Sequence, residues 1–180
     1  PYCYLVSRTM WPVLERHDVG LAWRPLGGWD GRSPPERAKV KIPLVRQDLA
    51  RWARRLDVPV NPPPITTEPT RAGAGSLLAE ERGLLKPYIV EVLKAEWAEG
   101  KDIGEPEVLF EVADRIGLDR IELAEAIEDP ARRDRLAANW VEAQERGVMG
   151  VPSFVVGDQI FWGNDRIDFL DEHLDSLNPG

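Results

Sequence analysis

The amino-acid sequence predicts an α/β protein in which a long helical segment separates two shorter units of mixed helix and strand. Three observations support this fold class. Residues 1–26 have the pattern of a helix followed by a strand, and residues 150–174 have the pattern of a β-hairpin followed by a helix. Between them, apolar residues recur at helical spacing. A chain of 180 residues that is 43% hydrophobic can form one compact domain, or a small domain with an insertion.

The first predicted helix runs from Pro1 to about His17, because proline is tolerated at the first position of a helix. Pro12 is expected to kink it. Loose alternation over Val19–Leu26 then predicts a strand. A central sheet needs a further strand before Pro1, so we expect the natural chain to begin upstream of this residue.

The middle of the chain is predicted to be helical, apart from a loop over 27–37 and an extended, proline-rich connector over 61–70. Glycine and aspartate stand at the expected stops and N-caps of these helices, at Gly117, Asp119, Asp129 and Gly147. The predicted helices span 38–56 with Pro43 in the first turns, 76–99 with a break near Pro87, 106–116, 120–127 and 130–146.

The pattern changes after Gly150. Two short apolar runs, Ser153–Val156 and Gln159–Trp162, flank Gly157 and Asp158, which predicts a β-hairpin. A last amphipathic helix is expected from about Asp165 to Leu174.

Composition limits the partners and the compartment. The formal net charge is -8, so nucleic acid and anionic membrane surfaces would be repelled, and no apolar run approaches the roughly 20 residues of a membrane span. One cysteine cannot form an internal disulfide, and the two histidines have no neighbour at metal-ligand spacing. We therefore expect a cytoplasmic protein with no metal site, no nucleic-acid partner and no membrane partner.

Three segments carry residues that suit a binding site. Cys3 stands near the start of the first helix, where the helix dipole lowers a thiol pKa, although a lone cysteine is more often a small buried apolar residue. Residues 150–152, Gly-Val-Pro, precede a strand, and their spacing alone indicates a turn. Asn164 and Asp165, with helix-end N–H groups, suit the ammonium and carboxylate of a γ-glutamyl group, or else cap the last helix.

A family resemblance covers nearly the whole chain. The residues that carry it lie at 39–48, 51–53 (Arg-Trp-Ala), 96–100 (Glu-Trp-Ala-Glu-Gly) and 162–166 (Trp-Gly-Asn-Asp-Arg). They resemble the 2-hydroxychromene-2-carboxylate isomerase family, a glutathione-binding branch of the DsbA-like thioredoxin superfamily that is related to kappa-class glutathione transferases. The resemblance implies a thioredoxin-like domain formed by residues 1–30 and 148–180, and an inserted helical domain formed by residues 31–147.

The resemblance also implies a function. Glutathione would bind as cofactor at the interface between the thioredoxin-like domain and the inserted helical domain. Its binding residues would be Val151, a cis Pro152, Trp162, Gly163, Asn164 and Asp165. In the family a serine immediately before the proline that matches Pro1 holds the sulfur, and the sequence does not contain that position. The implied isomerase opens an aromatic or unsaturated carboxylate by reversible thiolate addition, and the implied assembly is a homodimer.

Part of the chain departs from the family pattern. The loop Leu26–Arg37, which corresponds to the family's substrate loop, lacks the expected asparagine and lysine and offers Trp29, Arg32 and Arg37 instead. Leu44 stands where the family often has tyrosine. Arg46 and Arg51 are possible anion partners, or simply solvated. The physiological substrate therefore stays open.

Two other functions are compatible with the sequence. If cysteine preceded Pro1, Cys3 would be the second cysteine of a C-x-x-C motif in a DsbA-like thiol–disulfide oxidoreductase. A non-catalytic module that binds glutathione without turnover is the other alternative.

Overall fold

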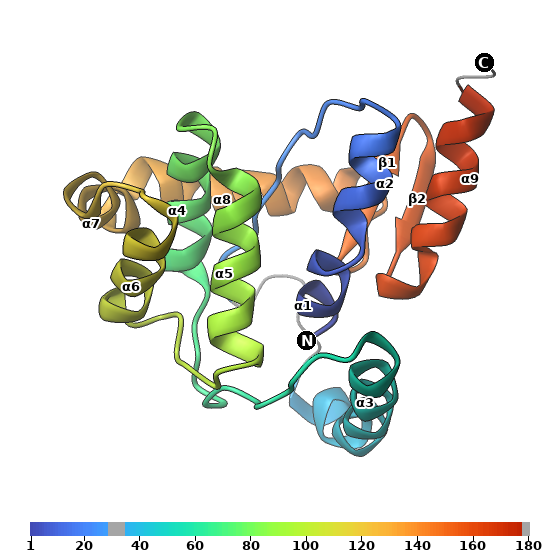
Figure 1. The fold of residues 1–180 in the computed structure, drawn as a ribbon, viewed down its shortest axis with the longest axis horizontal. Coiled ribbons are helices and arrows are strands. Elements are labelled where there is room, and N and C mark those ends of the chain that lie inside the picture. Colours follow the sequence, from blue (N-terminus) through green and yellow to red (C-terminus); the bar gives the residue numbers. More distant parts are fainter. Residues whose placement is uncertain (29–34, 178–180) are drawn as a thin grey trace.

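The structure is a computed structural model, and it describes residues 1–28 and 35–177. Within these residues, helices dominate and two strands form a small sheet (Figure 1). The elements are α1 (Tyr2–Ser7), α2 (Met10–Arg16), α3 (Pro35–Leu56), α4 (Thr70–Glu81), α5 (Leu85–Trp97), α6 (Pro106–Ile116), α7 (Arg120–Glu128), α8 (Pro130–Glu145), β1 (Ser153–Val156), β2 (Gln159–Trp162), the 3-10 turn η1 (Asn164–Arg166) and α9 (Ile167–Leu177).

The first predicted helix is two helices. The break lies at Arg8 and Thr9, between α1 and α2, and Pro12 is the third residue of α2. A proline inside a helix would clash with the carbonyl four residues earlier, here that of Arg8, and has no N–H to bond it. The helix therefore ends before Pro12 and begins again, instead of bending at it.

The predicted strand over 19–26 is wrong. The structure assigns no strand there, and within residues 1–28 and 35–177 the sheet consists of β1 and β2. The segment is tied to helices: the Trp23 indole N–H donates to the Ser76 hydroxyl at 2.8 Å, and the Asn139 amide donates to the Pro25 carbonyl at 2.9 Å. Because no strand lies beside it to form backbone hydrogen bonds, the segment makes hydrogen bonds with side chains instead.

Two helix boundaries differ from those predicted. Helix α3 begins at Pro35, so Pro43 lies in its interior and not in its first turns. Helix α4 begins at Thr70, six residues before the predicted start at Ser76, and includes Gly73 and Gly75. Glycine suits these two helical positions because other parts of the chain pack directly against them. A Cβ placed on Gly73 would lie 3.0 Å from the Leu26 carbonyl oxygen.

The remaining helices, the caps and the hairpin follow the prediction. Asp119 accepts from the backbone N–H groups of Ile121 and Glu122 at the start of α7, and Gly117 ends α6 in the left-handed conformation. Strands β1 and β2 pair antiparallel, with Ser153 opposite Trp162. Among the described helices none has both the length and the apolar character of a membrane span.

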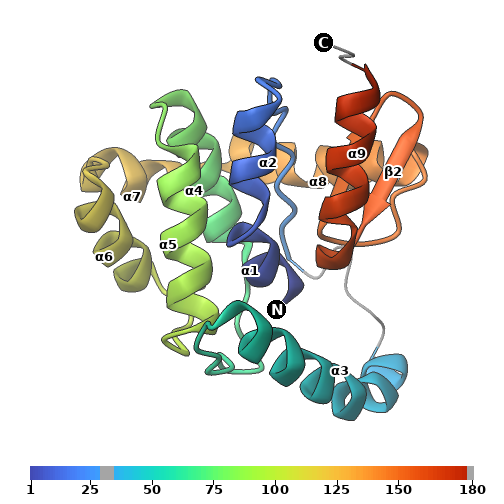
Figure 2. The same ribbon diagram turned by 45° about the vertical axis from the view of Figure 1, so that its right-hand side comes forward.

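Three apolar clusters hold the elements together. One lies among α4, α5, α6 and α7, and a second joins α1 and α2 to the hairpin and α9. The third packs Tyr4 and Leu5 of α1 against α3 and α5. Helix α1 thus lies between the helical part and the part with the sheet, while α8 runs behind both (Figures 1 and 2). The proposed division into residues 1–30 with 148–180, and 31–147, stays a prediction.

Candidate functional site

The segment before β1 lies directly beside the turn that follows β2. The peptide bond between Val151 and Pro152 is cis, as the family resemblance implies. The backbone N–H of Gly163 donates to the Pro152 carbonyl at 2.9 Å. Val151 is 45% exposed, whereas Pro152 is buried. Two segments that the sequence singled out separately, 150–152 and 161–166, therefore form one continuous surface.

The turn after β2 presents two polar side chains. Gly163 has φ of 105°, a backbone conformation that side chains with a Cβ rarely adopt, which favours glycine at this position. Asn164 is only 8% exposed, yet its side chain makes no hydrogen bond with a described residue. Asp165 is exposed and pairs with Arg166 at 2.6 Å. Neither Asn164 nor Asp165 accepts a side-chain hydrogen bond from the described backbone, so neither caps the last helix.

Tyr2 connects this turn to α1 and α3. Its hydroxyl donates to the Asp48 carboxylate of α3 at 2.8 Å. Burial, the hydrogen bond to Asp48 and the charge of Asp48 raise the pKa of Tyr2 to about 12, and the nearby Asp165 carboxylate adds to this effect. Asp48 is a site residue that the sequence did not single out, since an aspartate within a charged helix gives no signal of its own.

Cys3 differs from the reactive thiol that its position suggested. Burial raises the pKa of the Cys3 thiol, and the nearby carboxylate of Glu96 raises it further. The desolvation of a thiolate here outweighs the dipole of α1, a helix of six residues. Of the two interpretations of Cys3, the raised pKa counts against a reactive thiol, and the half-buried side chain fits a small apolar residue better.

Several predicted substrate contacts have different outcomes. Trp29 and Arg32 lie outside the described residues, as does the side chain of Arg37. Arg46 and Arg51 are exposed on α3 and make no ion pair with a described residue. Trp162 is 53% exposed and lies opposite Ser153 in the hairpin.

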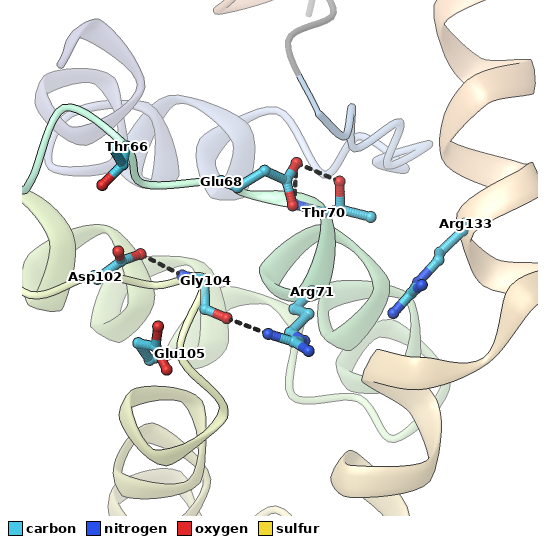
Figure 3. Close-up of a pocket in the computed structure, with 8 residues that line it drawn as sticks. All are labelled: Thr66, Glu68, Thr70, Arg71, Asp102, Gly104, Glu105 and Arg133. Atoms are coloured by element: carbon cyan, nitrogen blue, oxygen red, sulfur yellow. Dashed lines mark hydrogen bonds between the residues drawn. The ribbon is translucent and has the colours of Figure 1, made fainter.

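A separate hollow of about 460 Å³ lies between the start of α4 and the loop before α6 (Figure 3). Its polar groups are engaged with one another: Glu68 accepts from Thr70, and Arg71 donates to the Gly104 carbonyl at 2.8 Å and pairs with Glu128. None of the predicted site residues lines it. Among the described residues, no group of three or more His, Cys, Asp or Glu is arranged to hold a metal ion.

Comparisons with known proteins agree with the family resemblance. The family model of a DsbA-like thioredoxin domain matches residues 1–175. A 2-hydroxychromene-2-carboxylate isomerase from Sphingobium xenophagum is 29% identical, over 97% of this chain and 92% of its own. One from Pseudomonas putida is also 29% identical, over 98% of this chain and 90% of its own. The predicted family resemblance is confirmed by the family model and by these relatives, which are named as isomerases.

Solved structures support the fold. A 2-hydroxychromene-2-carboxylate isomerase superposes with a TM-score of 0.85 at 24% identity, over 98% of this chain and 90% of the other. A probable DsbA oxidoreductase from Streptomyces coelicolor superposes with a TM-score of 0.77 at 21% identity, over 98% and 84%. The predicted α/β class, a thioredoxin-like fold with a helical insertion, is confirmed by the family match and these likenesses. The chain belongs to the family of DsbA-like thioredoxin domains.

Proposed function

We propose that this protein is a glutathione-dependent isomerase that acts on an aromatic or unsaturated carboxylate, as its curated relatives' names indicate for them. Its cofactor would be glutathione and its assembly a homodimer in the cytoplasm. The relatives support an isomerase or a thiol oxidoreductase, and the arrangement of the site favours the first. The observation that carries this choice is the set of polar groups around Asn164.

The described groups fit the chemistry of a γ-glutamyl peptide. The Asn164 side chain makes no hydrogen bond with a described residue, so its amide is available to donate to and accept from a ligand. Asp165 offers an exposed carboxylate to an ammonium. The half-exposed segment at Val151 offers backbone groups to the peptide part of the ligand. These residues would bind and orient; they carry no proton in the reaction.

When bound, glutathione would supply a thiolate nucleophile for reversible addition to an unsaturated carbon of the substrate. The contribution of the chain is alignment, since holding two reactants in a fixed geometry accelerates their reaction strongly. Tyr2 keeps its proton at neutral pH because its pKa is about 12, and its hydroxyl donates its hydrogen bond to Asp48. We therefore assign Tyr2 to holding the site together, and no proton transfer to it.

Calorimetry with glutathione tests the site. We expect the wild-type protein to bind in the micromolar to millimolar range and Asp165→Ala to weaken binding at least tenfold, because a charge-assisted bond to the ligand ammonium is lost. Asp168→Ala is the matched control: it removes the same charge three residues later, from an exposed position of α9. Equal binding by both variants, or no binding by the wild type, would contradict the proposal.

The thiol oxidoreductase alternative depends on Cys3 as a resolving cysteine. Such a thiol must ionise and be reached by a partner. Burial raises the pKa of Cys3 instead, which counts against this role. Glutathione-driven reduction of a model disulfide by the protein, abolished by Cys3→Ala, would be the result that favours the alternative.

A further inference from the structure

Helix α3 is a strongly basic helix on an acidic protein. It carries seven lysine or arginine residues and two acidic residues, which gives it a formal charge of +5. The whole chain has a formal net charge of -8, so the rest of the chain carries -13. A charge separation of this kind favours association with a surface of the opposite sign.

The cations of α3 are also unpaired, unlike those of the rest of the chain. Among the described residues outside α3, nearly every lysine and arginine forms an ion pair with a carboxylate. Within α3, by contrast, Lys39, Arg46, Arg51 and Arg54 form no ion pair with a described residue. The fold therefore pairs its other cations internally and leaves these four open to a partner.

One exposed side of α3 has the residue spacing of a helix-packing seam. Five exposed residues recur at intervals of 4, 3, 4 and 3, which places them on one side of the helix over about four turns. Towards the start of α3 these residues are apolar, and towards its end they are cationic. They are Val40, Leu44, Gln47, Arg51 and Arg54, and we call them the α3 seam. A convex helix face of this length suits another helix.

Helix α9 carries the opposite charge on its own exposed side. Its sequence contains four acidic residues and no lysine or arginine. Asp168 and Glu172 are exposed and form no ion pair with a described residue, and Asp175 remains 67% accessible beside Arg16. Phe169 is 54% exposed among these carboxylates. We call Asp168, Phe169, Glu172 and Asp175 the α9 patch; like the α3 seam, it combines apolar surface with unneutralised charge.

The two surfaces do not cover each other within one chain. Helix α3 packs in the third apolar cluster through Leu49, and Val40 of the seam lies about 180° around the helix from Leu49. Helix α9 packs in the second apolar cluster, against α1, α2 and the hairpin. In Figure 2, α3 lies at one end of the molecule and α9 lies beside the hairpin. A contact between the two surfaces therefore needs a second molecule.

We propose that the α3 seam of one protomer packs against the α9 patch of a second copy of this chain, in two equivalent contacts related by a two-fold axis. The apolar residues of the seam contact Phe169, and Arg51 and Arg54 pair with the carboxylates of the patch. This inference rests on the homodimer of the proposed function and names the surfaces that form it.

A second copy suits the α3 seam better than other acidic partners. Each chain carries both complementary surfaces, so a two-fold dimer makes the contact twice and leaves neither surface open. An anionic membrane or a nucleic acid would meet the -13 charge of the rest of the chain and be repelled by it.

Sedimentation equilibrium of the full chain measures the dimer and its charge dependence. Arg51→Glu and Glu172→Arg should each weaken dimerisation at least tenfold, because each places like charges opposite one another in both contacts. Arg46→Glu is the matched control and should change the dissociation constant less than about twofold, since Arg46 lies about 140° around α3 from Arg51. Equal effects of Arg46→Glu and Arg51→Glu would reveal an effect of net charge alone and overturn the inference.

A mixture of the two reversed variants tests the pairing itself. Each variant alone has like charges in both contacts of its homodimer. In the mixed dimer the two substituted side chains face each other in one contact, and the native Arg51 and Glu172 face each other in the second. Native mass spectrometry of Arg51→Glu mixed with Glu172→Arg should therefore show the mixed dimer in excess over either homodimer. Two variants that stay monomeric when mixed would overturn the inference.

Glutathione titration of the wild type separates this inference from the proposed function. If the wild type dimerises and both reversals leave the dimer intact, only the assignment of the interface fails. If the wild type binds glutathione and stays monomeric, the interface and the homodimer fail together, while the glutathione site stands. Binding to phosphatidylserine vesicles in place of self-association would assign the α3 seam to a membrane and would also overturn the inference.

Discussion

Replacing Tyr2 by phenylalanine removes the hydroxyl that joins α1 to α3 and keeps the ring. That hydroxyl donates to the Asp48 carboxylate at 2.8 Å, and the ring packs at the edge of the third apolar cluster. A hydrogen bond to a charged group contributes about 1.5–3 kcal/mol. Because Tyr2 and Asp48 are both partly exposed, water replaces part of the lost bond. We expect Tyr2→Phe to lower the free energy of unfolding by about 1 kcal/mol.

The same contact makes the free energy of unfolding depend on pH in the alkaline range. The pKa of Tyr2 is raised to about 12 from an ordinary value of 10.0. Since the folded pKa is the higher one, the stabilisation is complete below pH 10 and is lost as the pH rises towards 12. A shift of two units corresponds to at most about 2.7 kcal/mol, and partial exposure reduces it to about 1 kcal/mol.

Urea denaturation followed by tryptophan fluorescence measures both effects. At pH 7, Tyr2→Phe, Asp48→Asn and the double variant form a cycle whose coupling energy should be about 1 kcal/mol. Between pH 10 and 12, the wild type should lose stability relative to Tyr2→Phe. A coupling energy below about 0.3 kcal/mol, together with parallel pH curves, would show that the hydroxyl does not hold α3 in place.

Three further predictions concern the frame of the site. Gly75→Ala should lower the free energy of unfolding, measured by urea denaturation, by about 2 kcal/mol, because a Cβ there would meet the Tyr88 hydroxyl and lie 2.9 Å from Leu123. Gly20→Ala is the control and should be neutral, because the space around Gly20 is open. Equal effects of the two variants would contradict the tight packing at Gly75. Asp119→Ala should cost about 1 kcal/mol in the same assay through loss of its two backbone hydrogen bonds, and an unchanged midpoint would refute its role as a cap. Cys3 should react with a disulfide reagent at pH 8 more slowly in the folded protein than in urea, because burial raises its pKa; equal rates would show an accessible thiolate.

The helices and the hairpin were predictable because local signals specify them. Asp119, Gly117 and the pair at 157–158 act on their own neighbours, so spacing and residue type suffice to place the helix ends and the turn. The segment 19–26 was not predictable in this way. Its alternation resembles a strand, but a strand exists only if a second one lies beside it, and this segment bonds to α4 and α8 instead.

The site was predictable in part. The family resemblance drew attention to 150–152 and 162–166, and the structure brings these segments into contact through Gly163 and Pro152. Asp48 was missed because its contact with Tyr2 spans 46 positions and depends on how α3 packs against α1. The raised pKa of Cys3 could not be predicted for a similar reason: helix position is visible in the sequence, whereas desolvation depends on the surrounding fold.

The most direct test of the central claim is a spectrophotometric assay of 2-hydroxychromene-2-carboxylate conversion by the protein with and without glutathione. The account predicts a rate that saturates with glutathione, that dithiothreitol at equal thiol concentration does not restore, and that falls for Asp165→Ala at subsaturating glutathione. Conversion at the same rate without any thiol, or no conversion together with reduction of a model disulfide, would contradict it.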